Sequence, residues 1–175
     1  MTDGVVTLRP WRPEDVDPLV ALCDDPEIVR FTRVLTPYTR DDALMYLAQQ
    51  VAAEERGEAV ALALVDAADD RLVGSVDLRR ASDGRASLGY LVGAAARGRG
   101  VATRAARMLS RWALAEWGVA RVEIHVQLDN PASQRVAERA GFVREGVLRS
   151  YLEVKGRRHD SVVFSLVPDD VGSAP

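Results

Sequence analysis

The sequence predicts an α/β domain built on a mixed β-sheet with helices on its faces. Strand-like and helix-like patterns alternate along the chain, and a long amphipathic helix lies between two of the strand patterns. A helical crossover joins parallel strands, whereas tight turns join antiparallel ones. Because 175 residues form one sizeable core and no linker-like stretch interrupts them, we expect one domain over 1–175.

The first third of the chain predicts an extended opening followed by helices. Residues 6–11 suit a short extended segment, and two short helices follow, the second beginning near Pro26. Thr39 or Asp41 can cap a longer helix that Gly57 ends. Its apolar residues recur at helical spacing: Ala43, Leu44, Leu47, Val51 and Ala52.

The middle of the chain predicts three strands in succession. Residues 59–65 are apolar throughout, as in a strand buried on both faces. Residues 72–78 and 85–92 flank Asp83-Gly84, a typical hairpin signal. The remaining elements follow in the order helix, strand, helix, strand, strand: residues 101–117, 122–128, 131–140, 142–148 and 160–167. A basic turn is expected at 155–158 and a frayed tail at 168–175.

Composition argues against several classes of function. The formal net charge is −3, which disfavours general attraction to nucleic acid or anionic lipid. No apolar run approaches the roughly 20 residues of a membrane helix. Cys23 is the only cysteine, so a reducing compartment is expected. Residues 1–8 lack the blocks of a signal peptide. We therefore expect a cytoplasmic monomer or homodimer with no nucleic-acid or membrane partner.

The loop over residues 93–103 is the most informative segment. A predicted strand ends, small residues follow, and a long helix begins. The first amides of a helix lack internal partners, and with the helix dipole they form an anion site. Gly98, Gly100 and Ala102 let a phosphate approach the backbone closely. The loop therefore predicts phosphate binding.

Three arginines, Arg97, Arg99 and Arg104, gather at this helix start, where the dipole disfavours cations. We interpret the cluster as a partner for a multiply charged anion; the alternative is a glycine-punctuated turn with solvated arginines. A nucleotide-triphosphate loop needs Lys and a hydroxyl residue where Arg99 and Gly100 stand. A dinucleotide loop needs glycine where Thr103 stands, so both of those loops fit poorly.

At this loop the chain resembles the GNAT superfamily of acyl-CoA-dependent N-acyltransferases. Arg97, Gly100 and Ala102 match its pattern of Arg or Gln, two residues, Gly, one residue, then Gly or Ala. The chain is most similar to the branch that acetylates the N-terminal amines of ribosomal proteins. The resemblance covers about residues 6–166.

Other motifs extend the resemblance in the same order. Residues 88–92 resemble the splayed fourth strand of the family, and Asn130 to Ser133 resembles its Asn-x-x-Ser helix, stopped by Gly141-Phe142. The resemblance implies a twisted mixed sheet of about seven strands. It also implies that this sheet splays at the fourth and fifth strands and carries flanking helices.

The family's activity implies transfer of an acetyl group from acetyl-CoA to a primary amine, by direct attack in a ternary complex and without a metal. Backbone amides from Arg99 to Thr103 would hold the pyrophosphate, and Leu91 or Val92 would pair with the pantetheine and polarise the thioester carbonyl. Asn130 would bind the pantetheine or only cap its helix. The implied cofactor-binding set is Leu91, Val92, Arg97, Gly98, Arg99, Gly100, Val101, Ala102, Thr103, Asn130 and Ser133.

Two positions depart from the family's pattern for the acid and the base. Many relatives carry a tyrosine acid where Ala137 stands, so Ser133 is the implied partner of the thiolate, or else only part of the helix's first turn. Ser87 stands where the branch often has a glutamate base. The candidate replacements on neighbouring strands are Asp77, Glu123 and His125, and water is the alternative.

Acceptor contacts are implied for the first two helices and the last hairpin. Arg33, Tyr38 and Tyr151 are the candidates, and each has packing or solvation as its alternative role. Four arginines would make this rim basic and favour an acceptor of acidic character: Arg30, Arg33, Arg157 and Arg158. Two other functions stay open, namely use of another donor such as succinyl-CoA and a non-catalytic acyl-CoA sensor.

Overall fold

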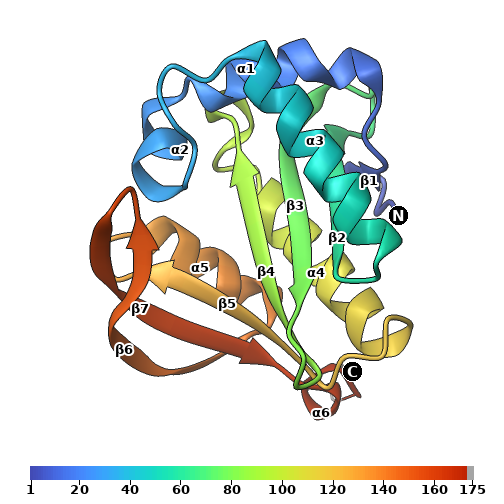
Figure 1. Ribbon diagram of the computed structural model, residues 1–175. Helices are drawn as coiled ribbons and strands as arrows, with labels where there is room; N and C mark the ends of the chain where they lie inside the picture. Colours follow the sequence, from blue (N-terminus) through green and yellow to red (C-terminus); the bar gives the residue numbers. More distant parts are fainter. Residues whose placement is uncertain (173–175) are drawn as a thin grey trace.

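A seven-stranded mixed sheet in the order β1-β2-β3-β4-β5-β7-β6 runs through the computed structural model, which describes residues 1–172 (Figure 1). Neighbouring strands are antiparallel except β4 and β5, which are parallel because a helix crosses between them. This confirms the predicted α/β class. The strands are β1 (Val6–Arg9), β2 (Ala59–Asp66), β3 (Leu72–Arg80), β4 (Arg85–Val92), β5 (Arg121–Gln127), β6 (Val143–Val154) and β7 (Arg157–Leu166).

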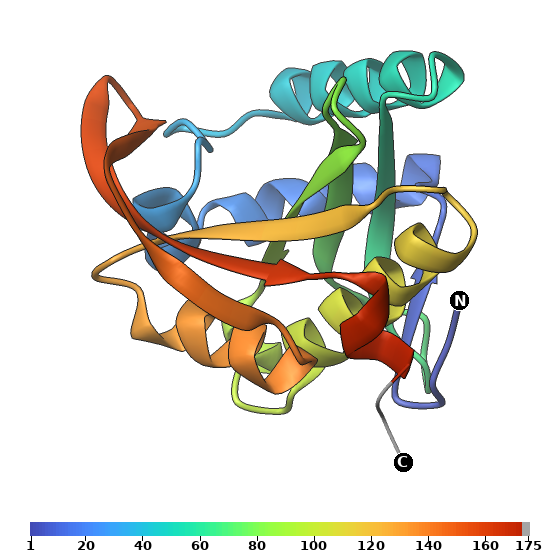
Figure 2. The same ribbon diagram turned by 90° about the horizontal axis from the view of Figure 1, so that it is seen from below.

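Helices cover both faces of the sheet (Figure 2). On one face, α1 (Val16–Cys23) packs on α3 (Arg40–Glu55) and on β3, while α4 (Val101–Ala115) and α5 (Pro131–Ala140) pack together on the other face. The first face also carries α2 (Pro26–Phe31), which follows α1. Short 3-10 turns, Pro13–Asp15 and Ala94–Ala96, precede α1 and α4.

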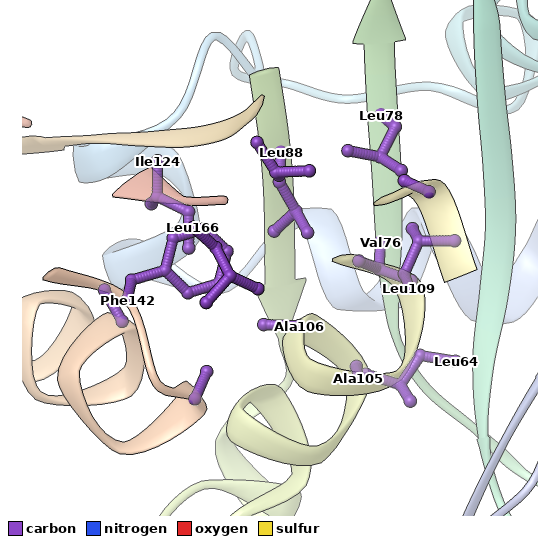
Figure 3. Close-up of a cluster of buried hydrophobic side chains, with 14 of the residues drawn as sticks. Leu64, Val76, Leu78, Leu88, Ala105, Ala106, Leu109, Ile124, Phe142 and Leu166 are labelled. Carbon is purple, nitrogen blue, oxygen red and sulfur yellow. The ribbon is translucent and has the colours of Figure 1, made fainter. Parts of the chain in front are cut away.

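The main core lies between the sheet and α4 (Figure 3). Alternate side chains of β3 and β4 point toward this helix, including Val76, Leu78 and Leu88, and they meet Ala105 and Leu109. Leu109 is fully buried. Burying such a side chain contributes about 1.5–3 kcal/mol, so this layer fixes the sheet against α4.

The strands β4 and β5 pair over only three residues each. Residues 85–87 align with 121–123, and beyond these the two strands diverge (Figure 1). The facing edges of residues 88–92 and 124–127 therefore lack strand partners across the gap. The expected splay at the fourth and fifth strands is confirmed.

Three expectations about elements were wrong. The last hairpin is longer than predicted, because β6 continues to Val154 and β7 begins at Arg157, which reduces the basic turn to Lys155-Gly156. Residues 149–153 do not show the period-two pattern that predicts a strand. They belong to β6 because that strand pairs with β7. Ser150 in this stretch has a φ of +54° beside a register shift.

The long helix α3 begins after its predicted cap, with Thr39 accepting from the backbone N–H of Asp42 at 3.2 Å. Its buried face differs from the predicted one. Leu44 and Val51 are 42% and 56% exposed, whereas Gln50 is buried and accepts a hydrogen bond from Arg79 at 2.8 Å. The buried face of α3 therefore includes Gln50, whose polar group has a hydrogen-bond partner, and excludes Leu44 and Val51.

Part of the expected tail is helical. Residues Pro168–Gly172 form α6, and Val171 packs against the main core. Pro168 starts the helix, and Asp170 accepts a hydrogen bond from the N–H of Val167 at 2.9 Å, which together nucleate it. Residues 173–175 of that expectation lie outside the described residues.

Candidate functional site

A cleft of about 1200 Å³ lies where β4 and β5 diverge. It extends from the start of α4 and the side chains of α3 to the β6–β7 hairpin. The structure brings nearly all of the sequence-predicted site residues to this cleft. Those lining it are Arg33, Tyr38, Leu91, Val92, Arg97, Gly98, Gly100, Val101, Ala102, Thr103, Glu123, His125, Asn130, Ser133 and Tyr151.

The start of α4 presents uncapped amides to this cleft. Gly100 is the N-cap residue, with a φ of +76°, and no side chain bonds to the helix start. The first intrahelical bond runs from the N–H of Arg104 to the carbonyl of Gly100 at 3.0 Å. The amides of Val101, Ala102 and Thr103 precede it and have no acceptor within the helix. This geometry fits an anion held by backbone groups.

Ion pairs within the protein hold the loop arginines, so a bound anion is not required to balance their charge, and the predicted anion partner stays a prediction. Each forms an ion pair with an acidic side chain from another segment, at 2.7 to 3.4 Å: Arg97 with Asp25 and Glu27, Arg99 with Asp66, and Arg104 with Asp3. Of the predicted cofactor residues, Arg99 alone lies outside the cleft lining. These ion pairs join distant segments and are invisible in the local sequence, and they give the arginines a structural role.

Ser133 and Tyr90 form a hydroxyl pair on the α5 side of the gap. The Tyr90 hydroxyl lies 2.6 Å from Oγ of Ser133 and 3.2 Å from its backbone oxygen. Burial raises the pKa of Tyr90 to about 12, more than the bond to Ser133 lowers it, so the phenol stays protonated at neutral pH. Sequence reasoning missed Tyr90 as a site residue. Its only signal was the alternation of β4, which sends residue 90 toward α5.

Asn130 caps α5 through its side-chain oxygen, which accepts from the N–H of Ser133 at 3.1 Å. The amide nitrogen of the same side chain donates to no other described residue. Asn130 itself lines the cleft. Ala137, where many relatives carry a tyrosine, is fully buried on the inner side of α5 and contributes no polar group.

Glu123 is held by three neighbours. It accepts from Arg121 at 2.7 Å, from Arg85 at 3.2 Å, and from Nε2 of His125 at 3.2 Å. Burial raises the pKa of Glu123, but these hydrogen bonds and the positive charge of Arg85 outweigh it and hold the pKa below its usual range. An ionised carboxylate held in this way is a weak proton acceptor.

His125 has neither ring nitrogen open to the cleft. Its Nε2 faces Glu123, and its Nδ1 is buried with no hydrogen-bond partner among the described residues. The ring stacks on Tyr151 at a centroid distance of 4.9 Å. Two of the three predicted base candidates, Glu123 and His125, therefore form a side wall of the cleft without an open proton acceptor in this conformation, and the third, Asp77, lines the same cleft.

The expected acceptor residues surround the outer part of the cleft. Arg33 is exposed, Tyr38 is half-buried, and burial raises the pKa of the Tyr38 hydroxyl to about 12. The rim is less basic than predicted, because two of its four arginines form ion pairs: Arg30 with Asp129 at 3.0 Å and Arg158 with Glu153 at 3.2 Å.

Residues 1–172 contain neither a membrane-spanning helix nor a cluster of metal ligands. No helix there is long and apolar enough to cross a membrane. In the same part of the chain, no three His, Cys, Asp or Glu side chains gather where they could hold a metal ion.

Comparison with known proteins identifies the class of protein to which this chain belongs. Residues 6–143 match the model of the acetyltransferase (GNAT) domain. The uncharacterized N-acetyltransferase p20 of Bacillus licheniformis is 28% identical over 165 residues, covering 93% of this chain and 92% of that protein. The probable N-acetyltransferase YjcK of Bacillus subtilis (strain 168) is 35% identical over 120 residues, covering 66% of each chain. The chain is thus an N-acetyltransferase, and it belongs to the GNAT family.

Solved structures agree with this fold. The microcin C7 self-immunity acetyltransferase MccE, in complex with acetyl-CoA and AMP, superposes with a TM-score of 0.84 at 23% identity, over 95% of this chain and 93% of that one. RimL, a ribosomal L7/L12 alpha-N-protein acetyltransferase in complex with coenzyme A, gives a TM-score of 0.81 at 18% identity, over 95% and 96%. At these identities the likeness concerns the fold.

Proposed function

We propose that this enzyme transfers the acetyl group of acetyl-CoA to a primary amine in a ternary complex, with residues 1–175 forming one catalytic domain. One observation carries the proposal: the gap between β4 and β5 joins the uncapped start of α4 to the Ser133–Tyr90 pair. The same cleft thus offers a phosphate site, unpaired strand edges and a hydroxyl pair. The acetyl-CoA complex of MccE, which shares the fold, supports the choice of donor.

Each part of the cleft receives one role. The amides of residues 100–103 hold the pyrophosphate at the helix start. The backbone of Leu91 or Val92 pairs with the pantetheine arm, and its N–H polarises the thioester carbonyl where negative charge develops. Asn130 donates to the pantetheine through its amide nitrogen, and Ser133 donates a hydrogen bond to the departing sulfur.

The outer part of the cleft takes the acceptor. Arg33, Tyr38 and Tyr151 surround the entrance and contact the part of the acceptor beyond its amine. Because Arg30 and Arg158 are paired, the charge of this rim gives little preference for an acidic acceptor.

Acetyl-CoA binding and thiol release test this proposal together. Titration calorimetry should show acetyl-CoA binding. A thiol-release assay with n-butylamine, spermidine and N-terminal peptides should show amine-dependent turnover, with succinyl-CoA compared as donor. A folded protein that fails to bind acetyl-CoA contradicts the proposal, as does faster turnover with succinyl-CoA. Tight binding with no turnover on any amine identifies a sensor instead.

A further inference from the structure

We propose that Asp77 of β3 binds the ammonium group of the acceptor and takes its proton, in place of the glutamate that is absent at Ser87. This inference rests on the proposed function, because it assigns a residue in the acceptor part of the same cleft. It identifies the acceptor as a cationic primary amine that reaches the sheet from the α3 side.

The position of the Asp77 carboxylate carries the inference. Asp77 pairs with Gly89 of β4, and a Cβ added at residue 89 would lie only 3.0 Å from Oδ1 of Asp77. The carboxylate therefore overlies β4 in space that a side chain at 89 would fill. Leu91 lies on the same face, about 7 Å further along the strand. Asp77 thus lies beside the segment of β4 proposed to hold the thioester.

The same placement lets Asp77 substitute for a carboxylate at position 87. Ser87 pairs with Arg79, so it is the diagonal neighbour of Asp77 on the same face of the sheet. Diagonal neighbours lie about 7–8 Å apart, within reach of a long side chain. A glutamate at 87 and the aspartate at 77 can therefore serve one point in the cleft from adjacent strands.

Of the two strand carboxylates that line the cleft, Asp77 and Glu123, Asp77 is the one with free hydrogen-bond acceptors. Its side chain is 25% exposed and accepts no hydrogen bond from any other described residue. Its nearest cation, Nε of Arg79, lies 3.8 Å away, and the guanidinium of Arg79 is already bonded to Gln50. Glu123, by contrast, accepts three hydrogen bonds. An incoming ammonium therefore finds open lone pairs on Asp77.

The surroundings strengthen Asp77 as a proton acceptor. Burial raises the pKa of its carboxyl more than the charge of Arg79 lowers it. Tyr46 of α3 lies within electrostatic range of Asp77, and Glu123 and His125 of β5 line the same cleft beyond β4. A carboxylate with a raised pKa is a stronger base, and a bound ammonium restores its ionised form.

Asp77 and the Ser133–Tyr90 pair then act from opposite faces of the sheet. Asp77 faces α3, whereas Tyr90 and Ser133 meet on the α5 side. Asp77 takes one proton from the ammonium, and the neutral nitrogen attacks the thioester carbonyl carbon. A C–N bond forms and the C–S bond breaks. The remaining excess proton on nitrogen passes to the thiolate, which Ser133 hydrogen-bonds, and Asp77 returns its proton to solvent.

Kinetics of three variants test the assignment, with acetyl-CoA as donor and n-butylamine, spermidine or Ala-Gly-Gly as acceptor. Asp77→Asn should lower kcat/KM by about 100-fold or more and remove the acidic limb of the pH profile, at unchanged affinity for acetyl-CoA. Adding Ser87→Glu to Asp77→Asn should restore part of the activity and the limb. His125→Asn, the matched control, should keep the limb. Loss of the limb in His125→Asn with its retention in Asp77→Asn overturns the inference.

An acceptor-binding measurement keeps this test separate from that of the proposed function. The carboxyl ¹³C resonance of Asp77 is assigned as the one that is missing in Asp77→Asn. In the coenzyme A complex this resonance should titrate with a pKa above the ordinary aspartate range. It should also shift when n-butylamine is added. Absence of that shift contradicts the role of Asp77, whatever the turnover. Failure of the protein to bind acetyl-CoA contradicts the proposed function instead.

Discussion

Single side chains in this cleft act through short polar contacts that the fold assembles. Tyr90 comes from β4 and Ser133 from the first turn of α5, 43 positions later, yet their hydroxyls lie 2.6 Å apart. A tyrosine hydroxyl has one proton. If it is donated to Oγ of Ser133, the serine proton is directed away from Tyr90 and toward the sulfur site. In the proposed mechanism Tyr90 would thus orient the Ser133 hydroxyl rather than replace it.

Removal of the phenolic hydroxyl tests this positioning role. Tyr90→Phe should lower kcat about tenfold and leave KM for acetyl-CoA nearly unchanged, because only the orientation of the serine hydroxyl is lost. Ser133→Ala should have at least the same effect, and the double variant should be no worse than Ser133→Ala alone. Steady-state kinetics measure all three. If the double variant lowers kcat by the product of the two single effects, Tyr90 acts independently of Ser133.

At this scale the sequence predicted Ser133 and Asn130, because a short motif places both at one helix start. It did not predict that Tyr90 contacts Ser133, nor that Arg85 and Arg121 form ion pairs with Glu123. Those contacts join residues from different strands and helices. Their geometry depends on sheet register and strand divergence, which no local pattern contains.

Among the elements, the start of α4 has the most specific task. Gly98 and Gly100 both adopt positive φ, so the chain turns sharply and exposes the next amides. A side chain at Gly100 meets open space rather than protein, so a substitution there acts on the backbone and on any ligand held nearby.

The variant Gly100→Asp should raise the Kd for acetyl-CoA at least about tenfold, equivalent to 1.4 kcal/mol, through strain and repulsion of phosphate. Gly57→Asp is the matched control, since Gly57 has a φ of +69°, open space around it and no place in the cleft lining. Both should lose a similar 1–2 kcal/mol of stability, roughly the penalty for a left-handed residue. Calorimetry and thermal denaturation separate the two effects. Equal Kd values for acetyl-CoA in Gly100→Asp and Gly57→Asp would show that the loop does not bind the donor.

Element prediction succeeded where a pattern was local and strong, and failed where pairing decided. β4 has the expected bounds, and α4 starts after the expected glycine, because the strand is bounded by turn signals and the helix has a clear amphipathic period. The outer half of the β6–β7 hairpin and α6 were missed. In the first case the sequence is polar and exposed, and in the second only Val171 contacts the core.

For the described part of the molecule as a whole, the larger cluster of buried apolar side chains lies between the sheet and α4, and a smaller one lies under α1 and α3. Leu109→Ala should lower the free energy of unfolding by about 2–5 kcal/mol, because it empties a fully buried site. Leu44→Ala, at a residue that is 42% exposed, should change it by about 0.5 kcal/mol or less. Urea titration of both variants measures the difference. Similar losses would mean that α3 contributes as much as α4.

The divergence of β4 and β5 has a consequence for how such an enzyme can change over generations. Main-chain groups along the gap would recognise the donor wherever the two strands follow this path, with little regard to which side chains the strands carry. Donor recognition is therefore buffered against mutation. If the proposed acceptor site is correct, exchange of residues around Asp77, on α3 and on the last hairpin should alter the accepted amine, and a library randomised there is the direct route to new acceptors.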